Sequence, residues 1–336
     1  MADRLLFPPT TVADMRQRGW DAPDFVYVVG EAYVDHPSFG HAIISRVLES
    51  AGYRVALLCL PEYHTSDAFR LFGRPKLGFL VSSGVIDSMV NHYTAAKKRR
   101  GTDAYAPGGQ AGMRPDRAVT VYCNRIHEAY PGMPVLIGGV EASLRRFSHY
   151  DYWDDKVRRS VLVDSAATLL MYGMGEKTII ECCDWVRRGM PAHELPTLRG
   201  CCYMAKEPPK NAILLPGHSE VAADRTAYAR AFMLEYEEQD PMRGKTLCQQ
   251  QDSLRFLVQN PPAMPLNRAE LDEVYDLPFT RRAHPCYDRL GGRKYASPSR
   301  RCAAALARAI SARLHFIRAE LLPHAAKRRC SKRLSC

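Results

Sequence analysis

The chain has 336 residues, of which 46% are hydrophobic and 25% are charged, so it can bury a large core in two, at most three, domains. Its longest apolar runs, such as residues 55–60, are far shorter than the roughly 20 residues that span a bilayer. Its first residues include acids and prolines where a signal peptide has a basic start and an apolar run. These features argue against a membrane-spanning or exported protein and predict a cytoplasmic one.

The net charge of +11 is concentrated at the end of the chain. From residue 293 onward, twelve Lys and Arg residues face a single acidic residue, Glu320, so this segment accounts for the whole excess. The first 292 residues are formally neutral, and we therefore expect neither a membrane surface nor a nucleic acid as a partner of the main body. Only the basic tail has the charge to bind nucleic acid, and no other partner is indicated.

Eleven cysteines in a cytoplasmic chain first suggest a metal or redox site. Their spacing does not support one, because no Cys-x-x-Cys or Cys-x-x-x-Cys occurs. Cys182 and Cys183 are adjacent, as are Cys201 and Cys202, and the other seven stand alone. We expect most of them to be small buried apolar residues, and we predict no metal ligand.

Five short apolar runs predict buried strands, at residues 25–29, 54–60, 77–81, 133–139 and 167–172. A helical pattern follows the first run, with Ser38 placed to cap the helix and Gly52 placed to end it. Other helices are predicted at residues 116–129, 176–186 and 223–238. Strands that alternate with helices at this spacing predict an α/β fold with a doubly wound, mostly parallel sheet.

Ligands of such sheets bind beyond the carboxyl ends of the strands. Three loops are predicted there, at residues 30–40, 138–143 and 173–176. These loops supply the candidate cofactor-binding residues, which are Asp35, His36, Ser38, Gly138, Gly139, Glu141, Gly173 and Glu176. We assign no catalytic residue.

The first loop invites comparison with the cobalamin-binding signature Asp-x-His-x-x-Gly, in which the histidine ligates cobalt. Here Asp35 directly precedes His36, and three residues separate His36 from Gly40. A histidine ligand needs a correctly placed carboxylate at its second ring nitrogen. The spacing therefore argues against cobalamin and favours a turn that leads into the following helix.

The other polar segments are also open to a structural interpretation. Gly138 and Gly139 would let a ligand approach the backbone, or would serve a tight turn that needs a positive φ. Glu176 would either cap its helix or contact a ligand. Residues 143–162 combine aromatic and basic side chains that suit nucleic-acid stacking, but their three aspartates favour internal ion pairs.

Six segments together resemble the N-terminal half of the YgiQ-type radical SAM proteins, a family of uncertain biological role. The most characteristic are GEAYVDHPSFGHAIISRVLE, DAYAPGGQAGMRPDRA and IGGVEASLRRFSHYDYWDDKVRRSVLVDS, and the six extend from about residue 5 to residue 287. The resemblance implies a sheet related to cobalamin-type domains in which the histidine no longer has the spacing of the cobalt-binding signature.

The resemblance also implies the cofactors of the family, a 4Fe-4S cluster and S-adenosylmethionine, which together generate a 5′-deoxyadenosyl radical. In the family, a Cys-x-x-x-Cys-x-x-Cys motif holds the cluster and opens the barrel that follows the His284-Pro285 segment. No such triplet occurs here. We therefore expect a truncated radical SAM protein that binds neither cofactor itself, with a stand-alone module for a nucleotide-like ligand as the alternative.

The chain is thus predicted to have three parts. Residues 1–205 form the radical SAM N-terminal α/β domain, and residues 206–290 form an irregular connector toward a missing barrel. Residues 291–336, rich in Arg, Ala, Ser and Cys, have the composition of a gene read out of frame. We expect them to be an aberrant, poorly packed and disordered basic tail; a functional nucleic-acid arm is the other interpretation.

Overall fold

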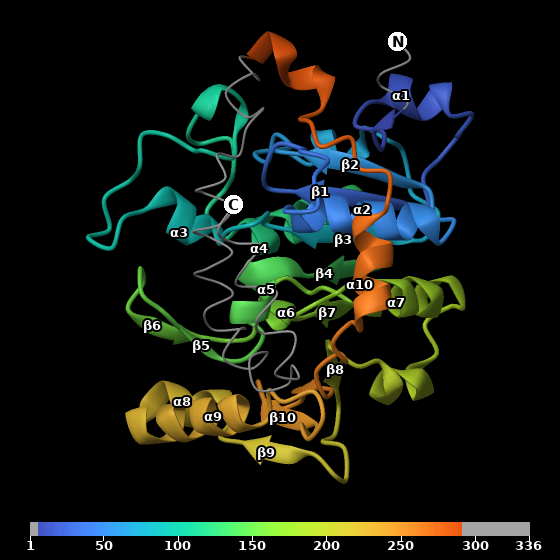
Figure 1. Cartoon of the computed structure of the whole chain (residues 1–336). Coiled ribbons are helices and arrows are strands. Elements are labelled where there is room, and N and C mark those ends of the chain that lie inside the picture. Colours follow the sequence, from blue (N-terminus) through green and yellow to red (C-terminus); the bar gives the residue numbers. More distant parts are fainter. Residues whose placement is uncertain (1–5, 291–336) are drawn as a thin grey trace, which may run out of the picture. The chain divides into compact units, whose positions relative to one another are not determined.

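Five parallel strands form the centre of the structure, a computed structural model that describes residues 6–290 (Figure 1). The strands are β1 (Phe25–Val29), β2 (Val55–Cys59), β3 (Gly78–Ser82), β4 (Val135–Ile137) and β7 (Leu169–Met171). Their order in the sheet is β2-β1-β3-β4-β7, and every neighbouring pair is parallel. The predicted α/β fold with a mostly parallel sheet is confirmed.

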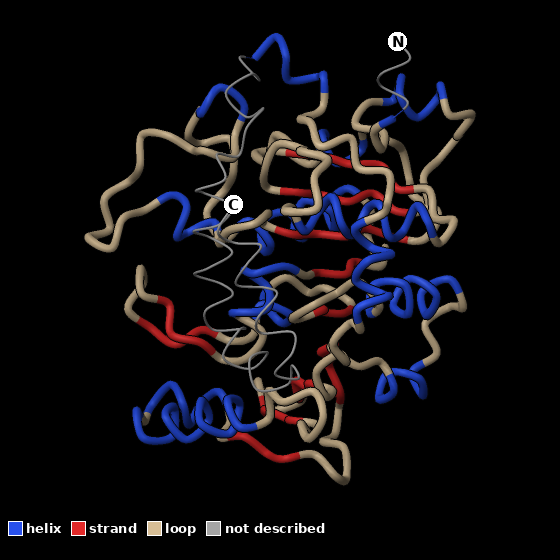
Figure 2. Tube along the Cα trace, in the orientation of Figure 1, coloured by secondary structure: helices blue, strands red, loops and turns tan. Residues whose placement is uncertain are grey.

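Helices cover both faces of these strands (Figure 2), because the strands bury side chains on both sides. All five residues of β1 are buried. Val26 and Val28 share a core with α4 (Ala118–Ala129), whereas the other three residues of β1 share a second core with α2 (Gly40–Ser50) and α7 (Thr178–Arg187). This alternation follows the two-residue period of a strand.

The start of α2 differs from the prediction. The helix begins at Gly40, after Phe39, and no side chain caps it. The prediction that Ser38 caps this helix is therefore wrong, because Ser38 lies one residue before the capping position. Gly52 does follow the end of the helix, with a φ of +83° that favours glycine, as predicted.

Shorter elements precede, connect and follow the central strands. They are α1 (Val12–Gln17), η2 (Asp67–Arg70), α3 (Ser88–His92), η3 (Pro107–Gly109), α5 (Gly139–Leu144), β5 (His149–Asp151), β6 (Lys156–Arg158), α6 (Val161–Asp164) and η4 (Ala192–Thr197). Strands β5 and β6 form a separate antiparallel hairpin. In the chain, the hairpin follows α5, which itself follows β4.

Four further strands extend the sheet past β7, in the order β8-β11-β10-β9. They are β8 (Cys201–Ala205), β9 (Ile213–Leu215), β10 (Leu247–Gln250) and β11 (Phe256–Gln259). Strand β8 is antiparallel to both β7 and β11, and β10 is antiparallel to β11 but parallel to β9. Three of these strands lie in residues 206–290, so the sheet is larger than the sequence pattern predicts.

The sequence does not reveal these strands because they are short and partly polar inside. Gln249 of β10 and Gln259 of β11 are fully buried. The Oε1 atom of Gln249 accepts a hydrogen bond from the backbone N–H of Ser148 at 2.9 Å, and that of Gln259 accepts one from Arg146 Nε at 2.6 Å. Both amide oxygens are thus hydrogen-bonded, and buried amides of this kind interrupt the apolar pattern from which strands are predicted.

The remaining elements are α8 (His218–Ala223), α9 (Arg225–Glu237), α10 (Arg268–Tyr275) and η5 (Pro285–Leu290). Helix α9 confirms the helix predicted at residues 223–238. Residues 260–267 and 276–284 contain no helix or strand of their own. The rest of the predicted irregular connector, residues 206–290, is mostly regular, because it contains β9, β10, β11, α8, α9 and α10. One unit spans Met1–Gly292, so no boundary is visible at residue 205. The predicted tail, residues 291–336, lies outside the described residues.

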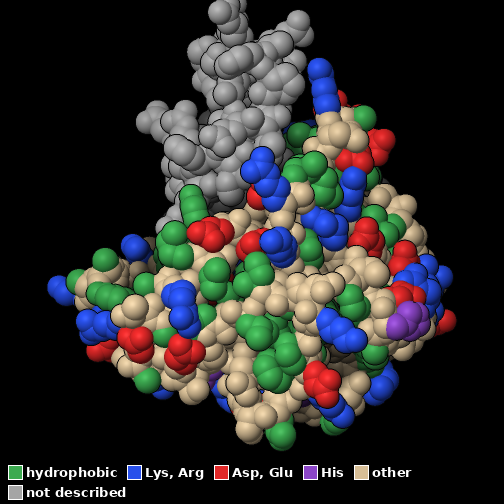
Figure 3. All heavy atoms as spheres, turned by 90° about the horizontal axis from the view of Figure 1, so that it is seen from below, with side chains coloured by type: hydrophobic (Ala, Val, Ile, Leu, Met, Phe, Trp, Pro, Cys, Tyr) green, Lys and Arg blue, Asp and Glu red, His purple; other side chains and the backbone are tan. Residues whose placement is uncertain are grey.

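The end of the sheet at β9 carries exposed apolar side chains. Figure 3 views this end of the molecule and shows hydrophobic side chains among charged ones. Leu214 of β9 and Tyr236 of α9 are each 60% exposed, and Phe232 and Met233 of α9 are each 50% exposed. Helix α9 and strand β9 thus leave four large apolar side chains exposed at this end of the sheet. Within residues 6–290, no helix is long and apolar enough to cross a membrane.

Candidate functional site at the carboxyl edge of the sheet

The three predicted loops lie at one edge of the sheet, because β1, β4 and β7 run in the same direction. The loop after β3 joins them there and approaches the first loop closely. A Cβ atom on Gly30 would lie 2.6 Å from the backbone oxygen of Ser83, and one on Gly84 would lie 2.6 Å from the Glu31 carboxyl group. Only glycine permits this contact, so the crevice between β1 and β3 is closed tightly.

Glu31 and His41 fill this crevice. Both are buried, and Glu31 Oε1 lies 2.7 Å from His41 Nδ1. The other oxygen of Glu31 accepts a hydrogen bond from the backbone N–H of Val85 at 3.1 Å. A backbone N–H at this edge is the kind of group that would bind a ligand anion in a doubly wound sheet. Here the protein's own carboxylate occupies it.

Asp35 is fully buried and has several partners within the chain. It accepts hydrogen bonds from Arg46 Nε at 3.0 Å, from Arg46 Nη2 at 2.5 Å and from the hydroxyl of Tyr33 at 2.9 Å. The backbone N–H of Thr280 donates a fourth, at 2.8 Å. These bonds occupy both oxygens of the carboxylate, so the geometry gives Asp35 a structural role; its predicted role toward a cofactor stays a prediction.

The segment around residue 280 covers the first loop with its own backbone. Val34 and Ala283 form an isolated antiparallel bridge. The N–H of Asp35 donates to the oxygen of Arg282 at 3.0 Å, and the N–H of His284 donates to the oxygen of Tyr33 at 3.0 Å. We call this contact between residues 33–35 and 280–284 the clasp. The clasp covers the part of the first loop that contains Asp35.

His36 and Ser38 form the turn that the sequence favoured. The backbone N–H of Ser38 donates to His36 Nδ1 at 3.0 Å, and the N–H of Phe39 donates to the oxygen of His36 at 2.9 Å. Burial lowers the pKa of His36, and the charge of Arg281 lowers it further. In a metal-binding histidine, the ring nitrogen that does not bind the metal donates a hydrogen bond to a carboxylate or a similar acceptor. In His36, Nδ1 instead accepts a hydrogen bond from a backbone N–H, so these residues do not fit cobalt ligation.

Glu141 joins two helices. It is 1% exposed, and its oxygens accept hydrogen bonds from the backbone N–H groups of Ser88 at 2.9 Å and Val119 at 3.0 Å, in the first turns of α3 and α4. A carboxylate there also interacts favourably with both helix dipoles. Gly138 is extended, whereas Gly139 has a φ of +83°, so this loop contains the turn with a positive φ that the sequence allowed.

The third loop has open space beside its first glycine. Gly173 has a φ of +74°, and a Cβ atom there would meet nothing within 4 Å. Lys177, not Glu176, occupies the capping position of α7, and no side chain caps this helix, so the capping interpretation of Glu176 is wrong. Glu176 Oε2 is buried and accepts no hydrogen bond from the described residues. Glu176 is thus the predicted site residue whose carboxylate is least engaged.

The polar segment at residues 143–162 contains the internal ion pairs that the sequence favoured. Asp151 accepts hydrogen bonds from Arg117 Nη2 and from Arg158 Nε, both at 2.7 Å. Asp154 also pairs with Arg117, at 3.0 Å, and with Arg158. These arginines are therefore neutralised within the protein.

The cysteines do not fit a 4Fe-4S cluster. Within residues 6–290, no three His, Cys, Asp or Glu side chains lie close enough to hold a metal ion. The Sγ atoms of Cys182 and Cys201 lie 3.3 Å apart, but both residues are fully buried, and burial raises the pKa of the Cys201 thiol. Cluster ligands are thiolates, which this environment disfavours.

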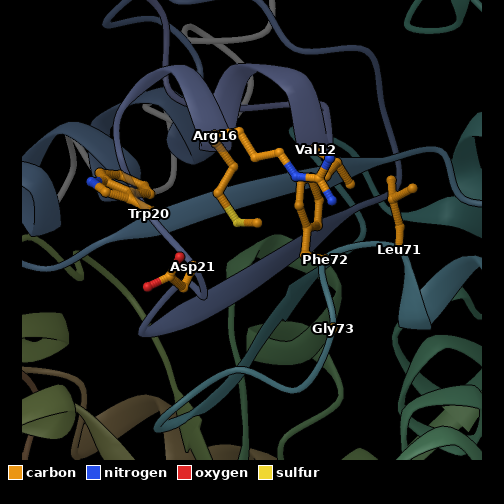
Figure 4. A pocket seen from close by; sticks show the side chains of 8 residues that line it. Val12, Arg16, Trp20, Asp21, Leu71, Phe72 and Gly73 are labelled. Atoms are coloured by element: carbon orange, nitrogen blue, oxygen red, sulfur yellow. The ribbon is translucent and has the colours of Figure 1, made fainter.

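A hollow of about 310 Å³ lies away from the three loops (Figure 4). Its residues belong to α1 and to the segments that lead into β1 and β3, so they precede the strands instead of following them. They are Val12, Met15, Arg16, Trp20, Asp21, Leu71, Phe72 and Gly73. None of the predicted site residues lines this hollow.

The sequence missed Glu31, His41 and Arg46 as residues of this edge. Glu31 had a detectable signal, since it directly follows the glycine that ends the first strand. His41 and Arg46 lie inside α2, and their roles depend on partners in other elements. Together these residues define a doubly wound α/β domain whose carboxyl edge is filled by the chain's own side chains and backbone.

Comparison with known proteins identifies the family. The family model described as Radical SAM N-terminal matches residues 7–295. A UPF0313 protein of Clostridium botulinum is 52% identical over 288 residues, which cover 85% of this chain and 45% of that protein. A UPF0313 protein of Clostridium perfringens is 52% identical over 289 residues, which cover 85% and 44%. The chain belongs to the Radical SAM N-terminal family and spans about half the length of the curated relatives it matches.

Solved structures with partial similarity include the radical S-adenosylmethionine methyltransferase TsrM from Kitasatospora setae. The structure with cobalamin and a [4Fe-4S] cluster bound has a TM-score of 0.36 and 15% identity, and the match covers 57% of this chain and 30% of that chain. The structure with tryptophan and a S-adenosylmethionine analogue bound has a TM-score of 0.34 and 16% identity, with 54% and 28% covered.

Proposed function

We propose that this chain is a non-catalytic domain of a radical SAM protein and that its carboxyl edge fixes the following chain segment instead of binding a cofactor. The clasp between residues 33–35 and 280–284 carries this proposal. It places protein backbone where a doubly wound sheet usually binds its ligand. The radical chemistry itself, with its 4Fe-4S cluster and S-adenosylmethionine, is proposed only for the longer proteins of the family.

The side chains at the edge support this proposal over a stand-alone module for a nucleotide-like ligand. Glu31 occupies the backbone N–H of Val85 in the crevice between β1 and β3, and a phosphate there would meet a buried carboxylate at close range. The exposed apolar side chains near β9 support a place within a larger protein.

We also propose that the protein works in the cytoplasm. Among the described residues, the seven cysteines other than Cys286 are not joined in disulfides. The Sγ atoms of Cys182 and Cys201 lie 3.3 Å apart and are not bonded to each other. Free thiols in this number suit a reducing compartment.

Anaerobic reconstitution of the purified chain with iron and sulfide tests the chemical half of the proposal. We expect no stoichiometric cluster absorbance and no cleavage of S-adenosylmethionine, with the UPF0313 protein of Clostridium botulinum treated in parallel. A stoichiometric cluster that is lost in the Cys182→Ala or Cys201→Ala variant would overturn the proposal. Equilibrium dialysis with ATP, S-adenosylmethionine and hydroxocobalamin tests the alternative, and saturable binding of any of them would favour it.

Hydrogen exchange tests the clasp. Residues 280–284 should exchange slowly in the wild-type chain, because their backbone groups are bonded to the first loop. The Asp35→Asn variant should expose this segment to faster exchange, whereas Ser38→Ala, a change at an exposed residue, should not. Equal exchange in all three proteins would contradict the role assigned to the clasp.

A further inference from the structure

Four consecutive basic residues form an exposed turn between α3 and η3. We call residues 97–100 (Lys97, Lys98, Arg99 and Arg100) the basic turn. All four are exposed, and among the described residues none of them lies within ion-pair distance of a carboxylate. The nearest charge effect is that of Arg99, which, against the effect of burial, helps to lower the pKa of Asp116. The loop that contains them extends from the molecule on the same side as the β5–β6 hairpin (Figure 1).

The basic turn has a defined conformation. Tyr93 and Arg99 form an antiparallel bridge. The backbone N–H of Thr94 donates to the oxygen of Lys98 at 2.9 Å, and the hydroxyl of Thr94 accepts from the N–H of Lys98 at 3.2 Å. Lys97 has a φ of +58°. The chain is therefore folded back so that it presents four cations on one short turn.

The β5–β6 hairpin supports the turn from the side. The hydroxyl of Tyr152 donates to the backbone oxygen of Ala95 at 2.8 Å. Lys97 Nζ donates to the backbone oxygen of Trp153 at 3.3 Å and lies 4.8 Å from the centre of the Tyr152 ring. Tyr150 lies on the same hairpin, and Tyr150 and Tyr152 are 47% and 45% exposed. Cations and partly exposed aromatic rings are thus neighbours.

The charge of this turn is unusual for the chain. The first 292 residues are neutral as a whole, and the nearby Arg117 and Arg158 are paired with Asp151 and Asp154. The basic turn concentrates four like charges that repel one another in the free protein. A polyanion would relieve that repulsion.

We propose that the basic turn and the β5–β6 hairpin bind single-stranded nucleic acid. The cations would neutralise successive phosphates, and the rings of Tyr152 and Tyr150 would stack on bases, which is the combination that single-stranded nucleic acid requires. An acidic protein would use the cations but not the rings. The nearby Asp154 is neutralised by Arg117 and Arg158, and Asp155 accepts a hydrogen bond from the Tyr150 hydroxyl at 2.5 Å, so neither acid is left without a partner on this surface.

Fluorescence anisotropy with labelled single-stranded RNA and DNA of about 12 nucleotides, a length within the usual site size, tests the proposal on the full chain. The test variant replaces Lys98, Arg99 and Arg100 with Gln. The control variant also introduces Gln, at the exposed residues Lys206, Lys210 and Lys245 near β8, β9 and β10. Both variants therefore lose three positive charges, and both keep the basic tail. The test variant should bind the oligonucleotide at least about tenfold more weakly than the control does. The slope of log K against log salt concentration should be less negative by about 2 for the test variant than for the control.

The aromatic contribution has its own test. Tyr152→Leu should weaken binding about fivefold or more, whereas Tyr152→Phe, which keeps the ring, should stay within about twofold of the wild type. A photoreactive 4-thiouridine oligonucleotide should crosslink to the peptide that contains Tyr152 or to that of the basic turn. Circular dichroism melting curves would confirm that each variant is folded.

Three outcomes would overturn the proposal. The first is no measurable binding at low salt. The second is equal binding by the test and control variants, which would place the affinity in the tail. The third combines two results: polyglutamate displaces the oligonucleotide at an equal concentration of charge, and Tyr152→Leu does not change the affinity for the oligonucleotide. This outcome would indicate an acidic protein as the partner.

Discussion

Arg46 donates two hydrogen bonds to Asp35, one from Nε to Oδ1 and one from Nη2 to Oδ2, in a pair whose side chains are 5% and 0% exposed. Burial alone would disfavour the charge on Arg46, but the bonds and the charge of Asp35 raise the pKa of Arg46. The pair lies between the first loop and the segment at residue 280. It therefore couples the edge of the sheet to a segment that is distant in the sequence.

Replacement of Asp35 with Asn should destabilise the protein strongly. The neutral amide would remove one of the two carboxylates that pair with the buried Arg46 and would leave only Glu49, at 2.8 Å. Removal of one partner from a buried pair costs about 3–5 kcal/mol when no other charge compensates, so we expect a loss near the lower end of this range. Urea unfolding followed by circular dichroism should show this loss. Ser38→Ala, in the same loop but exposed, should change the free energy of unfolding by less than about 0.5 kcal/mol. An Asp35→Asn protein as stable as the wild type would show that the pair contributes nothing.

Glu141→Gln tests whether the second loop is built for the fold. Glutamine keeps one acceptor oxygen but loses the charge and one of the two bonds to the backbone N–H groups of Ser88 and Val119. A bond to a charged group contributes about 1.5–3 kcal/mol, so the free energy of unfolding should fall by about that amount. A variant with unchanged stability but altered binding of a small molecule would instead assign Glu141 to a ligand site.

The central sheet was predictable because its strands have continuous apolar sequences. Strand β1 (Phe25–Val29) is five apolar residues long and is buried throughout, and parallel strands covered on both faces require such a run. The order β2-β1-β3-β4-β7 then follows the usual rules for crossover connections. Strands β9 and β10 escape this reasoning because neither lies in a continuous buried apolar run: Leu214 of β9 is 60% exposed, and the buried Gln249 interrupts β10.

The candidate site was predictable in its position but not in its contacts. Sequence order places Asp35 and Glu141 at the carboxyl edge, and the structure has them there. The partners that satisfy Asp35 include Thr280, which is 245 residues away along the chain. No local pattern indicates such a contact, so a buried structural carboxylate and a carboxylate that faces a ligand look the same in the sequence.

Glu235 on α9 should make the protein less stable as the pH rises toward 7. Burial raises the pKa of Glu235 to about 7, and the charge of Arg146 lowers it only in part. Between the ordinary pKa of 4.5 and about 7, the folded protein holds a proton that the unfolded chain has released, so stability falls as the pH rises through this window. Glu235→Gln should therefore stabilise the protein above pH 7 by about 1–2 kcal/mol, a value reduced for partial exposure.

Thermal unfolding between pH 4.5 and 8 measures this effect. Glu237→Gln removes a carboxylate from an exposed position of the same helix and serves as the matched control, with a pH profile like that of the wild type. The interpretation would be wrong if Glu235→Gln kept the wild-type slope across this window.

Asp151 should contribute stability that is lost in acid. Burial raises its pKa, but hydrogen bonds from Arg117 and from the backbone N–H groups of Trp153 and Asp154 outweigh this effect and lower the pKa from 3.8 to about 2. A lowered pKa means that the folded protein holds the charged form more tightly than the unfolded chain does. The contribution, about 2 kcal/mol, is therefore complete above pH 4 and disappears as the pH falls from about 4 to 2.

Urea unfolding at pH 6 and at several values between pH 4 and 2 tests this expectation. The wild type should lose more stability over that range than Asp151→Asn, because the variant has no carboxylate to protonate at this position. Asp67→Asn is the control, since the Asp67 side chain is 84% exposed and its removal should leave the wild-type acid slope. Equal acid slopes for the wild type and Asp151→Asn would mean that the bonds from Arg117 do not hold the carboxylate in its charged form.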